Sequence, residues 1–442
     1  MAAEANDPRL DALPPRVLPL LYIGTAHASL ALALASVAWW PRAVTGFFYH
    51  SWMVALVHLV TLGWITLSIL GALYIVGPMA LRMPIPARRG DYVAYALLVI
   101  GLVGMVAHFW IGEFGGMAWS AGTAAGGILY VMIRVMAALG RSAAPREVKL
   151  HIRLAAVNLL GAATVGVLLA CDKVYHFLPG YILSNVLAHA HLAAVGWATM
   201  MVVGVGYRLL PMVLPAAPPQ GRSVALSAIL LEAGIVLLFV GLIAGARWTP
   251  VGGLLIVAGL LSFFRHVVVM ARHPRPRPVG AVRPDFAVWH AMAAGACLIA
   301  AMVIGLILLV MPMSERTLRA ALAYGVLGLL GFLSQMILGI ETRILPIHAW
   351  YWAFADTGFQ GPVVAPQAMG SQTLRMLVFY LWLWGVPALA LGFFTDRSAV
   401  VGAGAWALLA GVILAAFNTA SVLAHAIDHR SLRAPTGTDQ GL

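Results

Sequence analysis

Twelve long apolar stretches follow one another along the chain, and each is long enough to cross a bilayer as an α-helix, which takes roughly 20 residues. Hydrophobic residues make up 62% of the 442 residues and charged residues only 10%, which is more apolar sequence than a soluble core needs. Helices pair their own backbone N–H and C=O groups, as lipid requires. We therefore expect an all-α, polytopic membrane protein in contact with membrane lipid. The expected spans are 16–40, 52–81, 93–114, 118–139, 150–171, 181–214, 222–246, 248–271, 286–313, 317–345, 373–395 and 399–426.

Basic residues are concentrated in the connections on one side of these spans. By the positive-inside rule this side faces the cytoplasm, and an even number of spans places both termini there. The net charge of +12 is thus explained without nucleic acid as a partner. We expect a protein of the bacterial inner membrane. The basic residues on this side are Arg82, Arg88, Arg89, Arg141, Arg146, Lys149, Arg272, Arg275, Arg277 and Arg283.

The chain divides into a membrane domain, residues 16–429, and two tails. Residues 1–15 lack the basic-then-apolar pattern of a signal peptide, so we expect a short cytoplasmic tail. Residues 430–442 are expected to be a disordered tail. The long connection 346–372 is expected on the cytoplasmic side, with its aromatic residues in the lipid interface. The two cysteines, Cys171 and Cys297, lie far apart and predict neither a disulfide framework nor a thiolate metal site.

The second and sixth spans carry the same pattern. A shift of 133 residues aligns His58 with His191, and the segments HLVTLGWITLSILGALYIVGPMAL and HLAAVGWATMMVVGVGYRLLPMVL then share residues throughout. A weaker third copy follows at a shift of 135 residues, with Tyr324 and Val326 in place of His189 and His191. The copies divide the twelve spans into three quasi-repeats of four, about 16–140, 150–271 and 286–426.

Histidines in the repeated spans are the main candidates for binding a cofactor. Residues two apart on a helix point roughly 200° apart, so His189 and His191 suit two separate sites rather than one ion. His58 lies at the same depth as His191 in the repeat. Imidazole binds haem iron, copper and zinc, although a membrane histidine can also be a hydrogen-bonded core residue. Three further histidines on the outer side, His50, His108 and His176, are candidates for binding a metal.

Two of the spans resemble those of a known family. The second span resembles the second span of haem-copper oxidase catalytic subunits, nitric oxide reductases included. The sixth resembles the HxH span of that family, especially in C-family oxidases, and twelve helices in three groups of four is the family's architecture. The matching residues are His58, Trp64, Gly71, Ala72, Tyr74 and Pro78 in the second span, and His189, His191, Tyr207 and Pro211 in the sixth.

The resemblance implies ligands and chemistry. Carried over by motif, His58 and His191 would be the axial ligands of a b-type haem, and His189 would bind a second haem or a metal. The HxH motif lies on the tenth span in the family and on the sixth here. Because the chain has no adjacent pair of histidines, the family's copper site cannot be placed by motif, although copper remains a candidate cofactor. The organisation also resembles the nitric-oxide-response haem and copper membrane proteins (NnrS).

We therefore expect a haem-binding membrane redox protein that reduces O2 or NO or transfers electrons through b-type haem. The alternatives are a non-enzymatic haem- or copper-binding protein of nitric oxide or metal response, and a transporter with a midplane site. The chain has no CxxCH motif for covalent haem, so electrons would come from a cytochrome c, a cupredoxin or a quinol. Partner subunits are a further candidate. Glu232, in the middle of a span, is a candidate proton relay or a hydrogen-bond partner of a neighbouring helix.

Overall fold

The computed structural model of the chain describes residues 13–276, 283–355 and 366–431. Within these ranges the chain is helical and contains no strand. Twelve of its helices are long and apolar enough to cross a membrane, as the apolar stretches of the sequence predict. The tails at residues 1–12 and 432–442, and the part of the long connection at 356–365, lie outside the described residues.

Nine of the twelve membrane-length helices are regular α-helices, and the other three contain a π-helical segment. The regular helices are α1 (Leu18–Trp39), α5 (Arg89–Ile111), α6 (Met117–Arg141), α7 (Arg146–Tyr175), α10 (Arg222–Ala244), α11 (Thr249–Arg272), α12 (Phe286–Val310), α15 (Gln372–Phe394) and α16 (Ser398–Ser431). Two short helices, α2 (Pro41–Val44) and the 3-10 helix η5 (Pro366–Ala368), lie in connections.

The three interrupted helices form the centre of the bundle, and we call them inner helices 1, 2 and 3. Their π-helical segments contact one another, and each inner helix packs along the helix that precedes or nearly precedes it, α1, α7 or α12. Inner helix 1 is α3 (Ser51–His58), η1 (Leu59–Thr66) and α4 (Leu67–Ala80). Inner helix 2 is α8 (Ile182–His191), η2 (Leu192–Thr199) and α9 (Met200–Val213). Inner helix 3 is α13 (Glu315–Val326), η3 (Leu327–Ser334) and α14 (Gln335–Phe354).

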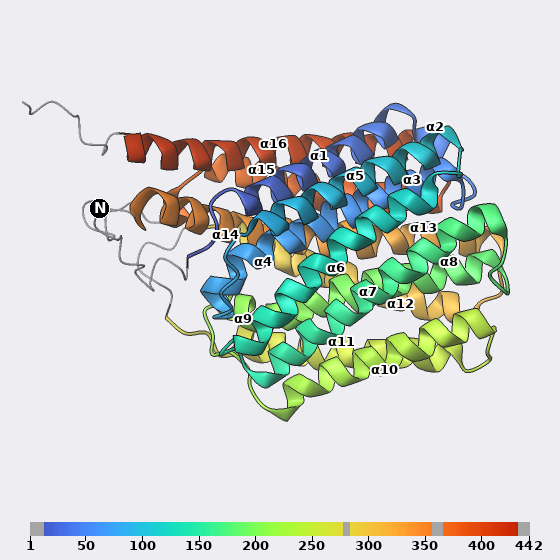
Figure 1. The fold of residues 1–442 in the computed structure, drawn as a ribbon, viewed down its shortest axis with the longest axis horizontal. Helices are drawn as coiled ribbons and strands as arrows, with labels where there is room; N and C mark the ends of the chain where they lie inside the picture. The colour runs from blue at the N-terminus through green and yellow to red at the C-terminus, as the bar shows by residue number, and fades with distance from the viewer. Residues whose placement is uncertain (1–12, 277–282, 356–365, 432–442) are drawn as a thin grey trace, which may run out of the picture.

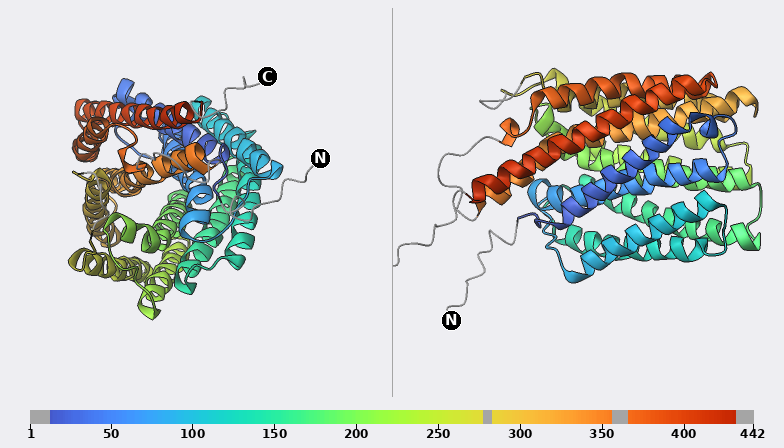
Figure 2. Two further views of the ribbon diagram at one scale, coloured as in Figure 1. Left: turned by 90° about the vertical axis from the view of Figure 1, so that its left-hand side faces the viewer. Right: turned by 90° about the horizontal axis from the view of Figure 1, so that it is seen from above.

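The helices run roughly side by side, so the bundle has two ends (Figure 1). We call the end where α1 begins and α16 ends the terminal end, and the other the far end. Seen from the terminal end, the early, middle and late helices of the chain occupy different sectors around a common axis (Figure 2, left). Both α3 and α8 begin at the far end, so residues early in these helices lie near that end.

Glycines allow each inner helix to pack closely against its neighbour. A Cβ atom added at Gly71 would lie 2.9 Å from the Cβ of Tyr22 in α1, and one at Gly339 would lie 2.9 Å from the Cβ of His290 in α12. A Cβ at Gly204 would collide with the Cβ of His151 in α7. Backbones this close gain van der Waals contact that a larger side chain would prevent.

Two tryptophan side chains connect the inner helices to one another. Trp64 Nε1 donates a hydrogen bond to Ser334 Oγ at 2.8 Å, which joins inner helix 1 to inner helix 3. Trp197 Nε1 donates to Thr66 Oγ1 at 3.2 Å, which joins inner helix 2 to inner helix 1. Both indole rings are buried. These bonds satisfy polar groups that would otherwise be unpaired in an apolar interior.

The tenth span is longer than expected. The sequence predicts its end at residue 345, yet α14 continues through Pro346 to Phe354. Ala349, Ala353 and Phe354 are buried in a cluster with Val422 of α16, so packing keeps this segment helical. The beginning of the connection is therefore an extension of the helix, packed in part against the bundle.

Candidate functional site

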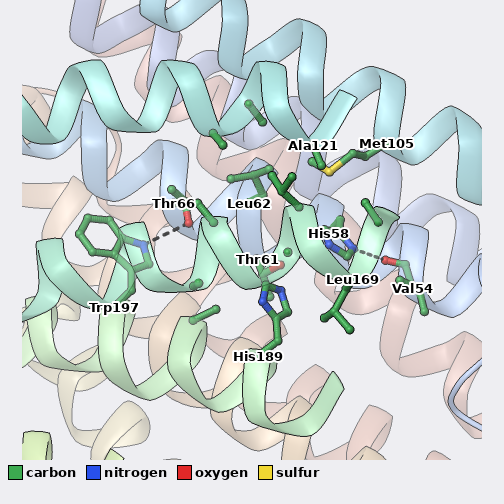
Figure 3. A pocket seen from close by; sticks show the side chains of 18 of the residues that line it. Val54, His58, Thr61, Leu62, Thr66, Met105, Ala121, Leu169, His189 and Trp197 are labelled. Atoms are coloured by element: carbon green, nitrogen blue, oxygen red, sulfur yellow. Dashed lines mark hydrogen bonds between the residues drawn. The ribbon is translucent and has the colours of Figure 1, made fainter. Parts of the chain in front are cut away.

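A cavity of about 170 Å³, measured as the space open to the centre of a water molecule, lies between inner helices 1 and 2 and the helices α5, α6 and α7 (Figure 3). It reaches from Tyr49 and Lys173, towards the far end, to Leu329 and Leu333 of η3. Its walls are mostly apolar, and the imidazoles of His58 and His189 are the titratable rings that inner helices 1 and 2 contribute. A buried, concave, mostly apolar space with a few polar groups is the usual form of a cofactor site.

Small side chains leave the cavity open. Segments of α6, α7 and η2 contribute alanine or glycine at positions where larger side chains would fill the cavity. They include Ala124, Ala162, Ala163, Gly166, Ala193 and Ala194. A wall of such residues makes room for a flat ligand between helices.

The imidazole ring of His58 is held in one orientation by its neighbours. Its Nδ1 lies 2.8 Å from the carbonyl oxygen of Val54, one turn earlier in α3 (Figure 3). Because a carbonyl only accepts hydrogen bonds, Nδ1 carries the proton and Nε2 keeps its lone pair. Metal-binding histidines are commonly held by such a bond from the other ring nitrogen. Phe109 stacks against the ring at 5.4 Å between centroids, which further fixes its orientation.

His189 enters the same cavity from inner helix 2 (Figure 3). Its Nδ1 is buried and makes no hydrogen bond of normal geometry within the described part of the chain, although the backbone of Ala162 is close enough to act on the ring. Gly166 makes room for the ring, because a Cβ atom there would lie 3.2 Å from His189 Cε1. His58 and His189 each lie seven residues after the first residue of α3 and α8, so they lie at similar depths.

His191 faces a different neighbour. Its Nδ1 lies 2.8 Å from the carbonyl oxygen of Leu187, and its Nε2 lies 3.2 Å from the hydroxyl of Tyr324 in inner helix 3. It is absent from the cavity that His58 and His189 share. The geometry therefore differs from the expected pairing of His58 with His191. Since residues two apart project to opposite sides of α8, the first histidine of HxH faces inner helix 1 and the second faces inner helix 3.

The three outer histidines are not brought together as a metal site. His50 caps α3, because its Nδ1 accepts a hydrogen bond from the Met53 N–H at 3.3 Å. Burial lowers the pKa of the His50 imidazole, which favours the neutral form that this cap requires. His108 Nδ1 lies 2.7 Å from the Glu113 carbonyl oxygen, and His176 follows α7 in a left-handed conformation, with φ of 48°. In the described ranges, no three His, Cys, Asp or Glu side chains are placed to hold a metal ion together.

Glu232 of α10 has a hydrogen-bond partner on a neighbouring helix. Asn158 Nδ2 of α7 donates to Glu232 Oε2 at 2.7 Å and also to the Gly196 carbonyl oxygen at 3.2 Å. This contact is the kind that we expect if Glu232 is a hydrogen-bond partner of a neighbouring helix. A role as a proton relay stays a prediction.

Two features of the site were not assigned from the sequence. Gly166 belongs to a row of small residues in α7, but nothing in the row indicates that it faces His189. Lys173 of α7 also lines the cavity, with its Nζ 4.8 Å from the Tyr49 ring centroid.

A scan against protein-family models and a search of curated proteins give no match to this chain.

Proposed function

We propose that this protein is an integral membrane haem protein that binds one b-type haem between His58 and His189 and transfers electrons through it. The observation that carries the proposal is the pair of imidazoles that faces one apolar cavity from two neighbouring inner helices. A haem held in this way would supply an iron centre whose reduction potential depends on its two imidazoles and on its apolar surroundings. The resemblance of the second and sixth spans to haem-copper oxidases agrees with this class of cofactor.

The side chains around the cavity fit such a group. His58 presents an Nε2 lone pair with no hydrogen-bond partner among the described residues, and His189 brings a second buried imidazole whose Nδ1 lies near the backbone of Ala162. Neutral imidazole is the form that binds iron, and an apolar cavity disfavours the charged form. The small residues on α6, α7 and η2 leave the space that a planar ring requires.

Three related units of four helices support placing the haem at one interface only. The π-helical segments begin at Leu59, Leu192 and Leu327, which repeats the shifts of 133 and 135 residues found in the sequence. Glycines at matching positions, Gly71 and Gly204 among them, contact α1, α7 and α12 in the same way. We infer that the units are quasi-repeats and that the inner helices form three comparable interfaces.

These interfaces differ in the ligands that they offer. Between inner helices 1 and 2, His58 and His189 share the cavity. At the matching positions between inner helices 2 and 3, His191 meets Tyr324, and the phenol takes the place of the second imidazole. At the third interface the matching residues are the apolar Val326 and Leu56. Only the first therefore offers two imidazoles, which supports a single haem.

The two histidines also favour electron transfer over reduction of O2 or NO. If His58 and His189 both bound the haem iron, they would leave no position for a small molecule, and the haem would supply electron transfer, which needs none. The far end, where Lys173 lines the cavity, is the side opposite most of the loop arginines. We propose that this side is periplasmic, in a bacterial inner membrane, and that a cytochrome c or a cupredoxin is the electron donor there, with a quinol as the alternative.

The experiment is a haem titration of the purified full chain in detergent. We expect one equivalent of haem b to give a sharp Soret band and the reduced bands of a six-coordinate, low-spin haem. Carbon monoxide should leave the reduced spectrum unchanged, because neither face of the iron is open. Failure to bind haem after haem-supplemented expression and in the titration would exclude the proposal, and rapid consumption of O2 or NO would favour the enzymatic alternative.

Lys173 is expected to strengthen haem binding modestly. Its ammonium group lies over the Tyr49 and Phe114 rings at 4.8 and 5.2 Å from their centroids, where it can attract a haem propionate. Replacing Lys173 with Gln should weaken haem affinity by about 0.2–1 kcal/mol, the usual range for a solvent-accessible ion pair. Haem titrations at low and high salt measure this change, which should shrink as salt screens the charge. An unchanged affinity at low salt would place the propionates elsewhere.

A further inference from the structure

A second pair of titratable side chains is buried outside the cavity that His58 and His189 share. His27 of α1 and Glu341 of α14 are each 7% exposed, and His27 Nε2 lies 3.3 Å from Glu341 Oε2. His27 Nδ1 lies 3.0 Å from the carbonyl oxygen of Ile23, which fixes the ring so that Nε2 faces the carboxylate. His27 Nε2 and Glu341 Oε1 are both buried, and neither makes a hydrogen bond of normal geometry in the described part of the chain.

Glu341 lines two cavities. One, about 80 Å³, is formed almost entirely by apolar side chains of α4, α9 and α14. The other, about 30 Å³, is lined in part by apolar side chains, and we call it the polar cavity for the polar residues that it also contains, which are His290, Glu341, Thr342, Arg375, Asn418 and Thr419. A cavity needs roughly 10–15 Å³ of such space to hold a water molecule, so the polar cavity has room for water beside the carboxylate.

The polar cavity lies towards the terminal end. His290 and Arg375 are close to the first residues of α12 and α15, which both begin at that end, and Asn418 is in the second half of α16, which ends there. Polar and charged side chains share the lining of this cavity with apolar ones such as Leu338 and Val378, and the Trp64 ring packs against His27, with ring centroids 5.1 Å apart. Glu341 thus lines one cavity that contains several polar side chains and another that is almost entirely apolar.

Few other charges face the pair. His290 on α12 donates or accepts at Nδ1 with Gln335 Oε1 at 2.7 Å, and Arg375 on α15 donates to the Met369 carbonyl oxygen at 2.5 Å. On α14 itself, Arg343 pairs with Asp285 and His348 Nε2 lies 3.1 Å from the Arg16 carbonyl oxygen. The polar groups that α16 presents to the cavity are Asn418 and Thr419, and α4 and α9 present mainly apolar side chains to the apolar cavity.

We propose that His27 and Glu341 form a proton-binding pair that exchanges one proton with water at the terminal end through the polar cavity. With one proton the pair is neutral, either as imidazole and carboxylic acid or as imidazolium and carboxylate. Release of that proton to water leaves a single negative charge on the pair, and uptake restores neutrality, with no other bond made or broken. A charge in an apolar interior is costly, so the state of the pair responds to nearby changes of charge.

The alternative is an ion pair that only holds α1 against α14. Such a pair would keep one charge state at all accessible pH values and would not exchange with solvent. Infrared difference spectroscopy separates the two, because the C=O stretch of a neutral carboxyl group is resolved from the bands of its carboxylate and shifts in D2O. The sample is the purified full chain, with or without haem, so the outcome does not depend on the haem proposal.

The key variant is Glu341→Gln, with Glu232→Gln as the matched control. Glu232 is the other carboxylate in the middle of a helix, and its partner is an asparagine that cannot titrate. We expect the wild-type acid-minus-alkaline spectrum to contain the C=O band of a neutral carboxyl group if Glu341 holds the proton, or imidazolium ring bands if His27 holds it. Either signal should disappear in Glu341→Gln and persist in Glu232→Gln. An identical spectrum in wild type and Glu341→Gln would overturn the proposal.

A second pair of variants tests the route and remains informative if Glu341→Gln does not fold. Thr419→Val keeps the shape of a side chain that lines the polar cavity but removes its hydroxyl, while Ser68→Ala removes a hydroxyl from the apolar cavity. Deuterium exchange of the Glu341 carboxyl group should slow severalfold in Thr419→Val and not in Ser68→Ala. Equal exchange in both variants, or no exchange in the wild type, would overturn the route.

Discussion

Replacing His58 or His189 with Ala should remove the haem spectrum of the purified protein, whereas replacing His191 with Ala should leave it. Each of the first two variants deletes one of the imidazoles that share the cavity. Loss of a group that only supports a metal ligand typically lowers affinity by about 10–100-fold, so loss of the ligand itself should cost at least that much. Haem content per protein and the Soret band measure the effect directly.

His191→Ala is the matched control because it changes the neighbouring histidine of the same HxH motif. It removes the contact with the Tyr324 hydroxyl without touching the cavity. Haem loss in His58→Ala and His191→Ala, with retention in His189→Ala, would instead support the pairing expected from the family motif. Retention in all three variants would mean that the iron ligands lie elsewhere.

Gly204→Ala should cause the largest loss of stability among single methyl additions to the inner helices. The new Cβ would collide with the Cβ of His151, which is a poorly deformable contact close to both backbones. Overpacking of this kind costs about 1–3 kcal/mol, more than the 0.5–1 kcal/mol that alanine gains over glycine in a helix. Thermal unfolding in detergent, followed by the loss of the monodisperse peak in size-exclusion chromatography, measures the change.

Gly24→Ala provides the comparison in α1. A Cβ at Gly24 meets nothing within 4 Å, so only the gain in helix propensity remains and the melting temperature should be equal or higher. Gly71→Ala and Gly339→Ala should fall between the two, because their added Cβ atoms would lie 2.9 Å from Tyr22 and His290. A Gly204→Ala protein as stable as the wild type would show that α7 can move away from inner helix 2 without cost.

The helices could be predicted from the sequence because lipid imposes one simple requirement on each of them. A stretch of about 20 apolar residues must pair its backbone internally, and length alone then sets its approximate ends. The extension of α14 to Phe354 could not be predicted in this way. It depends on packing against α16, which is remote in the sequence.

The site could be predicted only in part. The repeat indicated that His58, His189 and His191 matter, and the HxH spacing indicated that its two histidines serve different sites. Which of the two histidines faces His58 depends on the order of the inner helices around the axis of the bundle. The spacing of residues within one helix gives no information about that order. The pair formed by His27 and Glu341 was missed for the same reason, since its members lie on the first and tenth membrane helices.

The π-helical segments separate the two halves of each inner helix. The histidine end lies before η2, and the glycine that packs on α7 lies after it. One residue corresponds to roughly 100° of helical rotation. Adding or removing a single residue within a π-helical turn therefore rotates all side chains on one side of that turn relative to those on the other side. An insertion or deletion in the π-helical segment can thus change which side chains the first half of an inner helix turns towards its neighbour. The packing of the second half on α1, α7 or α12 remains undisturbed.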